Sequence, residues 1–280
     1  MILDPLRSCG HAVWSARVTD FTTGTLDEVD ATQVLPTASV GKIFALIAVA
    51  DLIERGALDP DERLEPTSDD MVADSGLLQH LVVQRLAVDD LARLVGAVSD
   101  NLATNVLLRR IGLSTVQERT TALGITDSAL NDVVRDDRRP GVRDDRRPGV
   151  HAATLSHGTA AELSRVAERL DRGGLVSSEV SARVRGWLAT NTDLSMVASA
   201  LAFDPLAHGG TDRATGMSMF NKTGTDEGTR ADVGVVRLGD RRVAYAVIAR
   251  WGREDMHSRA AVLDAMRTVG LGIRAHLTGW

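Results

Sequence analysis

The chain contains two lysines, Lys42 and Lys222, whereas arginine supplies the other 30 of its 32 lysine and arginine side chains. An arginine cannot release its proton in a protein, but a lysine can once burial or a neighbouring cation lowers its pKa. Two positions that keep lysine in so arginine-rich a chain indicate a need for a proton carrier or a compact charge. Chance placement is the alternative, and the surroundings of each lysine decide between the two.

Lys42 follows Ser39 by three residues, at the start of a long apolar run. Ile43–Ile53 is apolar almost all round, which predicts a buried helix that ends near Gly56. Ser39 and Lys42 then share one helix face. At the first turn of a helix, unpaired backbone N–H groups and the helix dipole favour an oxygen that becomes an anion. This indicates a nucleophile at Ser39, although a serine at a helix start is more often only a cap.

Lys222 lies in a predicted strand, Met217–Thr225, that is followed by two more β-rich runs. Those runs, Ala231–Leu238 and Arg242–Trp251, are joined by a Gly-Asp turn, which is typical of a hairpin. A lysine inside an apolar-flanked strand is unusual unless its charge is used. Gly224, two residues later, suits the close approach of a ligand to the strand edge.

A third polar element, Ser99-Asp100-Asn101, interrupts a helical pattern. Such triplets usually mark a cap or a turn, although Asn101 could also point into a cleft as an amide donor and acceptor. In chain order, S-x-x-K, S-D-N and K-T-G make the chain resemble the class A β-lactamases and the related penicillin-binding proteins. The 60-residue separation of the first two motifs, the SDNLATN continuation and the G-T-R at 228–230 add to the likeness. Glutaminases share the first motif but not, as a rule, the K-T-G strand.

The resemblance implies an α/β (α+β) fold with two lobes. Residues 1–45 together with 208–280 would form an antiparallel sheet flanked by helices, and residues 46–207 would form an all-helical lobe. The active site would lie in the crevice between them. The residue patterns agree, because 11–20 and the stretch before Pro36 read as strands, 258–277 reads as an amphipathic helix, and the family's N-terminal helix is much reduced.

The resemblance also implies a role for each motif residue. Ser39 would be the nucleophile that becomes acylated, and Lys42, kept partly neutral by burial and by Lys222, would take its proton. Ser99 would relay a proton to the leaving nitrogen. The backbone N–H groups of Ser39 and Thr225 would form the oxyanion hole. Asn101 would hold the substrate amide. A substrate carboxylate would be bound by Lys222, Thr223 and Arg230. Gly224 and Thr225, which follow on the same strand, would complete the substrate-binding residues.

One element of the family pattern is missing. Class A enzymes carry a loop glutamate, typically in E-x-x-L-N, that activates the water releasing the acyl group. The nearest likeness here is the segment 127–131, D-S-A-L-N, in which Asp127 is the candidate hydrolytic base. It is one methylene shorter and arrives several residues early. The sequence therefore predicts weak deacylation. The glutamates between S-D-N and K-T-G, none in such a motif, are Glu118, Glu162, Glu168 and Glu179.

The octapeptide RDDRRPGV occupies 135–142 and repeats at 143–150, directly after that segment. Proline and glycine exclude helix and strand there, and the alternating charges favour solvent. An in-frame duplication tolerated at the surface is the simpler interpretation, and it predicts an enlarged loop beside the active site that alters access. The alternative is that one repeat aspartate, Asp136, Asp137, Asp144 or Asp145, folds inward as the missing base.

Composition excludes several other functions. The net charge of −6 argues against a nucleic-acid-binding surface, and the longest apolar stretch is too short to span a bilayer. Cys9 is a lone, inert thiol, so no internal disulfide forms, and we read His208 as structural. The histidines show no metal spacing.

We expect no cofactor, no metal and no membrane partner. We also expect a monomer that is cytoplasmic as encoded, or secreted or periplasmic if a leader has been removed.

These observations lead to a serine acyl-transfer hydrolase that acts on β-lactams or related small amides and esters through an acyl-enzyme on Ser39. One alternative is an enzyme like a DD-peptidase or an esterase that binds penicillin. Another is a non-catalytic ligand-binding protein on the same scaffold.

Overall fold

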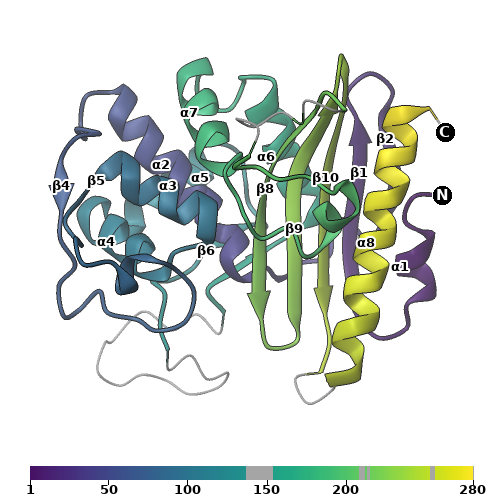
Figure 1. Ribbon diagram of the computed structural model, residues 1–280, viewed down its shortest axis with the longest axis horizontal. Helices are drawn as coiled ribbons and strands as arrows, with labels where there is room; N and C mark the ends of the chain where they lie inside the picture. Colours follow the sequence, from purple (N-terminus) through teal and green to yellow (C-terminus); the bar gives the residue numbers. More distant parts are fainter. Residues whose placement is uncertain (137–153, 208–211, 213–214, 253–255, 280) are drawn as a thin grey trace.

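An antiparallel sheet and a group of helices lie side by side in the structure, a computed structural model (Figure 1). It describes residues 1–136, 154–207, 212, 215–252 and 256–279. The strands are β1 (Val13–Asp20), β2 (Gly24–Val29), β3 (Leu35–Pro36), β4 (Arg63–Leu64), β5 (Leu86–Ala87), β6 (Ala129–Leu130), β7 (Ser156–Gly158), β8 (Met217–Asp226), β9 (Thr229–Leu238) and β10 (Arg241–Arg250). The helices are α1 (Asp4–Ser8), α2 (Lys42–Glu54), α3 (Val88–Val98), α4 (Asn101–Ile111), α5 (Leu113–Ala122), α6 (Ala160–Asp171), α7 (Ser178–Leu188) and α8 (Met256–Thr278), with 3₁₀ turns η1 (Ala38–Gly41), η2 (Leu78–His80) and η3 (Val197–Leu201).

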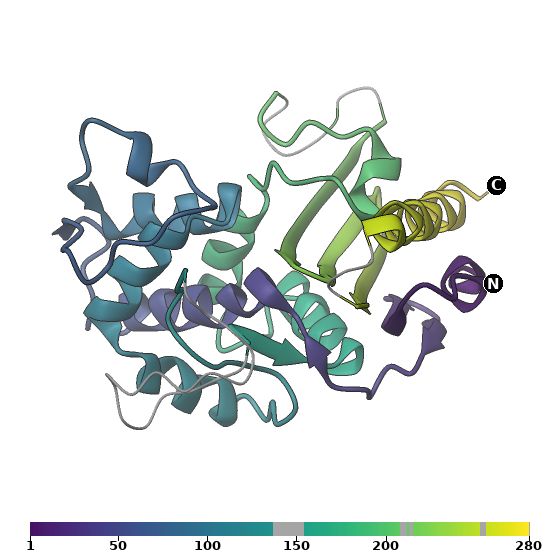
Figure 2. The same ribbon diagram turned by 90° about the horizontal axis from the view of Figure 1, so that it is seen from below.

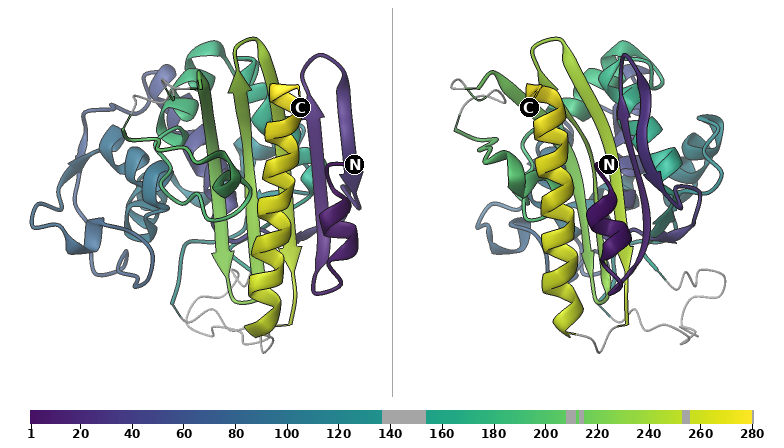
Figure 3. Two further views of the ribbon diagram at one scale, coloured as in Figure 1. Left: turned by 45° about the vertical axis from the view of Figure 1, so that its right-hand side comes forward. Right: turned by 90° about the vertical axis from the view of Figure 1, so that its right-hand side faces the viewer.

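The main sheet has the order β2-β1-β10-β9-β8, and every pair in it is antiparallel. Helix α6 packs on one face, whereas α8, α1 and η3 cover the other (Figures 2 and 3). Because side chains alternate along a strand, β10 contributes Ala244, Ala246 and Ile248 to the core on the α6 side. Its residues Tyr245 and Val247 enter the core beneath α8. Both faces of the sheet are therefore buried.

Helix α2 runs through the centre of the helical part, with α4, α5 and α7 as neighbours. Its residues 42–51 are all buried, which fits the apolar run that predicted a buried helix. The helix ends at Glu54, close to the predicted Gly56, which has a φ of 68°. A helix that is buried on every side holds its start rigidly, and the turn directly before it, η1, carries Ser39.

The predicted α/β (α+β) class with an antiparallel sheet is confirmed. The strand expected at 11–20 is β1, the Gly-Asp hairpin is β9–β10, and the C-terminal helix is α8. The N-terminal helix α1 is only five residues long. The two-lobe boundaries stay a prediction, and the structure adds that α6, within 46–207, packs against β1, β9 and β10.

The described helices include none that is both long and apolar enough to cross a membrane.

Candidate active site

The segment that carries Ser39 is the tight turn η1, which leads directly into α2. Ala38 has a φ of 48°, a conformation that non-glycine residues rarely adopt. Ser156 on β7 holds this turn, because its Oγ donates to the Ala38 carbonyl and lies 2.6 Å from the Thr37 hydroxyl. Gly41 permits the contact, since a Cβ there would lie 2.3 Å from Ser156 Cβ. Ser39 itself is half-exposed between buried neighbours, as a nucleophile open to substrate must be.

The edge strand β8, which carries K-T-G, packs one face against this turn, as does its neighbour β9. The approach is closest at Gly224, where a Cβ would lie 2.1 Å from the Thr37 carbonyl oxygen and 3.1 Å from the Val40 nitrogen. The backbone of η1 fills the space that a Gly224 side chain would take, while a ligand at the edge of β8 beside Gly224 stays a prediction. Gly224 therefore sets the distance between Ser39 and the edge strand.

Replacing Gly224 by alanine is expected to slow acylation of Ser39 by about 10²-fold, the cost of displacing a reacting group by roughly 1 Å. The methyl group would push η1 away from β8, so the nucleophile and the strand would no longer meet in register. The rate at which an acyl adduct appears in intact-protein mass spectra measures the effect. Gly186→Ala is the control, since a Cβ at Gly186 meets nothing within 4 Å. Equal rates in the two variants would contradict the positioning role.

Lys42 is fully buried, and its Nζ connects three chain segments. It donates to the Ser99 carbonyl and to Asn101 Oδ1, each at 2.6 Å, and lies 3.4 Å from Ser99 Oγ. Burial lowers the pKa of Lys42 well below its usual value, and the charge of Lys222 lowers it further. The charges of Asp100 and Asp74 act in the opposite direction. A neutral amine can accept a proton, so Lys42 is suited to act as a base for Ser39 in the preceding turn.

The S-D-N motif forms the corner between α3 and α4. Ser99 ends α3 in the left-handed region, with a φ of 56°. Asp100 caps α4 by accepting a hydrogen bond from the Ala103 N–H at 2.8 Å. Its carboxylate also accepts from the backbone N–H groups of Leu77 and Leu78. Asp100 is therefore a cap, the plainer of the two sequence interpretations, and it fixes the corner that presents the serine and asparagine beside it.

Lys222 is also fully buried, and its Nζ donates to the carbonyl of Thr223 at 2.8 Å. Burial lowers the pKa of Lys222 to about 8, against the charges of Asp193 and Asp232, which raise it. Burial raises the pKa of Asp232 to about 6, although Asn221 donates a hydrogen bond to it. Near neutral pH, Lys222 therefore carries most of its positive charge, and this charge adds to the effect of burial in lowering the pKa of Lys42.

Thr225 and Arg230 face each other across the β8–β9 hairpin, with Thr225 exposed and Arg230 buried. The Arg230 guanidinium donates to the carbonyls of Asp226 and Thr229 and lies over the Trp251 ring, 5.7 Å from its centroid. These contacts fix a cation at the end of β8 that the resemblance assigns to substrate binding.

The loop expected to carry a hydrolytic base reaches the site at Val134. The Asn105 side chain, one turn after Asn101 on α4, accepts from the Val134 N–H at 2.9 Å and donates to its carbonyl at 3.0 Å. Residues four apart share a helix face, so Val134 is held beside Asn101. The loop residue whose backbone Asn105 holds, Val134, therefore carries an apolar side chain.

The candidate base Asp127 lies at the surface, where its backbone N–H donates to Glu162 on α6. This position gives no support to a role in hydrolysis. Asp136, the first repeat aspartate, is exposed and accepts the Ala73 N–H at 2.9 and 3.0 Å. The Ala73 carbonyl in turn accepts from Asn101 Nδ2 at 3.3 Å. The other repeat aspartates, Asp137, Asp144 and Asp145, and His208 lie outside the described residues.

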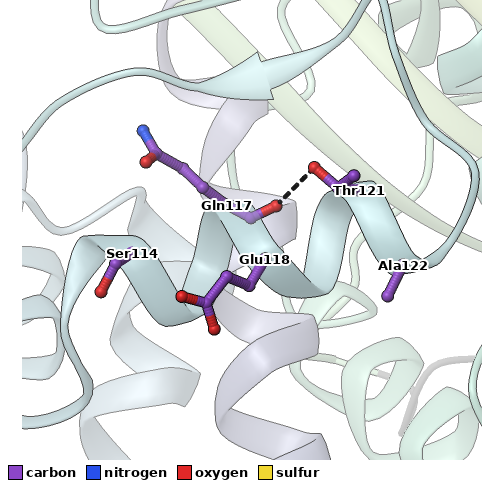
Figure 4. Close-up of a pocket in the computed structure, with 5 residues that line it drawn as sticks. All are labelled: Ser114, Gln117, Glu118, Thr121 and Ala122. Carbon is purple, nitrogen blue, oxygen red and sulfur yellow. Dashed lines mark hydrogen bonds between the residues drawn. The ribbon is translucent and has the colours of Figure 1, made fainter.

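The sequence analysis missed three residues that shape the site: Ser156, Asn105 and Asp193. Ser156 and Asp193 belong to no motif, and Asn105 is the last residue of SDNLATN, the one signal that could have identified it. A surface hollow on α5, lined by Ser114, Gln117, Glu118, Thr121 and Ala122, contains only residues of that helix (Figure 4). No cluster of metal-ligating side chains occurs among the described residues.

Comparison with known proteins identifies the family. A curated relative, the β-lactamase regulatory protein BlaB of Streptomyces cacaoi, is 26% identical over 97% of this chain and 95% of its own. A β-lactamase from Sphaerobacter thermophilus shares the fold with a TM-score of 0.81 and 21% identity, covering 100% of this chain and 96% of that one. PBP-A shares it with a TM-score of 0.77 and 18% identity, covering 98% and 94%. The model of the β-lactamase enzyme family matches residues 4–276, and the chain belongs to that family.

Proposed function

We propose that this protein is a serine hydrolase that forms an acyl-enzyme on Ser39 with β-lactams or related small amides and esters, and that it releases the acyl group slowly. The observation that carries the proposal is the fully buried Lys42 amine, with its lowered pKa, in the turn that follows a half-exposed serine. A buried amine whose pKa is lowered in this way has the chemistry of a general base.

In this reaction Ser39 Oγ attacks the carbonyl carbon while its proton passes to Lys42 Nζ. The oxyanion that forms on the carbonyl oxygen is stabilised by the backbone N–H groups of Ser39 and Thr225. The ring or ester bond then breaks, and Ser99, 3.4 Å from Lys42 Nζ, passes a proton to the leaving atom. Slow release of the acyl group follows from valine at the loop position that Asn105 holds.

Intact-protein mass spectrometry after mixing with benzylpenicillin, nitrocefin or an activated ester tests the proposal. We expect a one-to-one adduct on the wild-type protein and none on Ser39→Ala. Ser15→Ala is a suitable control, since Ser15 is buried in β1 and its Oγ accepts from the Ala160 N–H. An adduct of equal yield on Ser39→Ala would refute the assignment.

A second candidate function is ligand sensing without turnover. It is favoured by the Streptomyces relative, which is a β-lactamase regulatory protein, and by the apolar residue at 134. A persistent acyl-enzyme, or tight binding that Ser39→Ala leaves unchanged, would be its signature. The ratio of steady turnover to burst size separates it from a hydrolase.

A further inference from the structure

The segment Asn191–Ser195, which follows α7, spans the space between the S-D-N corner and β8. The Thr192 N–H donates to the Ala97 carbonyl at 2.8 Å, two residues before Ser99. On the other side, Asn191 Nδ2 donates to Asn221 Oδ1 at 2.8 Å, next to Lys222. The start of the segment is therefore held between the S-D-N corner and β8, beside the residues assigned to catalysis.

The carboxylate of Asp193 lies in the middle of this segment, and hydrogen bonds hold it in place. Its Oδ1 accepts from Ser195 Oγ at 2.7 Å and from the Ser195 N–H at 3.2 Å. The Thr223 side chain also acts on this carboxylate and lowers its pKa. Asn191 also accepts from the Asp193 N–H and donates to its carbonyl, each at 3.2 Å. These contacts hold the side chain against the K-T-G strand.

Asp193 interacts with the same groups that the resemblance assigns to a substrate carboxylate. Its charge acts on Lys222 and on Arg230, and the Thr223 side chain lies close enough to act on its carboxylate. Burial raises the pKa of Asp193, but the hydrogen bonds from Ser195, the Thr223 side chain and the charge of Lys222 outweigh it, so the pKa lies below its usual value. The group is a carboxylate at neutral pH.

We propose that Asp193 is a specificity-determining residue whose carboxylate takes the place of a substrate carboxylate beside Lys222 and Thr223. The site then selects amides and esters that carry no anion next to the scissile bond, because a second carboxylate would meet a like charge. This inference rests on the proposed function for its substrate class. It goes further by excluding the acidic substrates that the family motif alone implies.

A matched pair of acyl thioesters tests the selection. One has mercaptoacetate as its leaving group, and the other has the methyl ester of mercaptoacetate, which is neutral. We expect the wild-type protein to prefer the neutral thioester in kcat/KM, and Asp193→Asn to move this preference toward the carboxylate by about tenfold. Asparagine keeps an oxygen that can accept from Ser195, and Asp193→Ala serves if the asparagine variant does not fold. Asp240→Asn, at the exposed β9–β10 turn, is the control for an equal change in net charge.

A binding measurement separates this proposal from the proposed function. In the Ser39→Ala background, where no acyl-enzyme forms, calorimetry compares benzylpenicillin with its methyl ester. We expect the added Asp193→Asn change to tighten the binding of benzylpenicillin by about tenfold and to leave the binding of its methyl ester unchanged. This result would support the proposal even if Ser39 of the wild type is never acylated. Unchanged binding of both forms, or an equal change in both, overturns it.

The pH profile gives a further readout that a purely structural role would not move. Because the charge of Asp193 raises the pKa of Lys222, removal of this charge should bring the pKa of Lys222 below its present value of about 8. The alkaline fall in acylation rate should therefore begin at lower pH in Asp193→Asn than in Asp240→Asn. Coincident profiles would count against the proposal.

Discussion

Replacing Lys42 by arginine is expected to reduce acylation of Ser39 by about 10²–10⁴-fold, the usual contribution of a general base. The guanidinium cannot be deprotonated at the pH of the assay, so the serine proton has no acceptor. Time-resolved intact mass after mixing with an activated ester measures the loss.

The fully buried position of Lys42 makes a second variant necessary, because arginine is larger and permanently charged. Lys42→Met keeps the length of the apolar stem without an amine, and we expect the same loss of acylation from it. Thermal unfolding followed by circular dichroism establishes that both variants are folded. A folded methionine variant that is acylated at the wild-type rate would exclude Lys42 as the base.

Replacing Val134 by glutamate is expected to shorten the lifetime of the acyl-enzyme by about 10²-fold. Asn105 bonds to the backbone of residue 134 and not to its side chain, so a new side chain should keep the backbone in place. The carboxylate would supply the base that the family loop normally provides, beside Asn101 and the acylated serine. Decay of the adduct after removal of excess substrate gives the rate.

Val134→Gln is the matched control for that experiment, because it has the same shape as glutamate but cannot accept a proton from water. Faster release in the glutamate variant alone identifies a missing base as the cause of slow turnover. Equal release rates in the two variants would mean that deacylation is limited elsewhere.

Local patterns in the sequence predicted the elements that carry the motifs. Helix α2 follows from a continuous apolar run, and the β9–β10 hairpin follows from Gly239-Asp240 between two β-rich runs. Both depend on residues close together in the chain, where periodicity and turn chemistry determine the structure. The resemblance then placed the motifs in one site.

The contacts that define the character of the site were beyond such patterns. Asn105 meets Val134 across 29 residues, and Ser156 meets Ala38 across 118. Each contact depends on where a loop returns to the fold, which no local periodicity encodes. The same holds for Gly224, whose missing side chain leaves room for the backbone of η1.

The bond between Asp136 and the Ala73 N–H has a consequence for the duplicated octapeptide. Asp136 is the second residue of the first octapeptide, and the two octapeptides have identical sequences. Removing either unit, or adding another, leaves the same aspartate at the same distance from β6. The number of octapeptides can therefore change without loss of the hydrogen bond between Asp136 and Ala73, which lies next to Asn101.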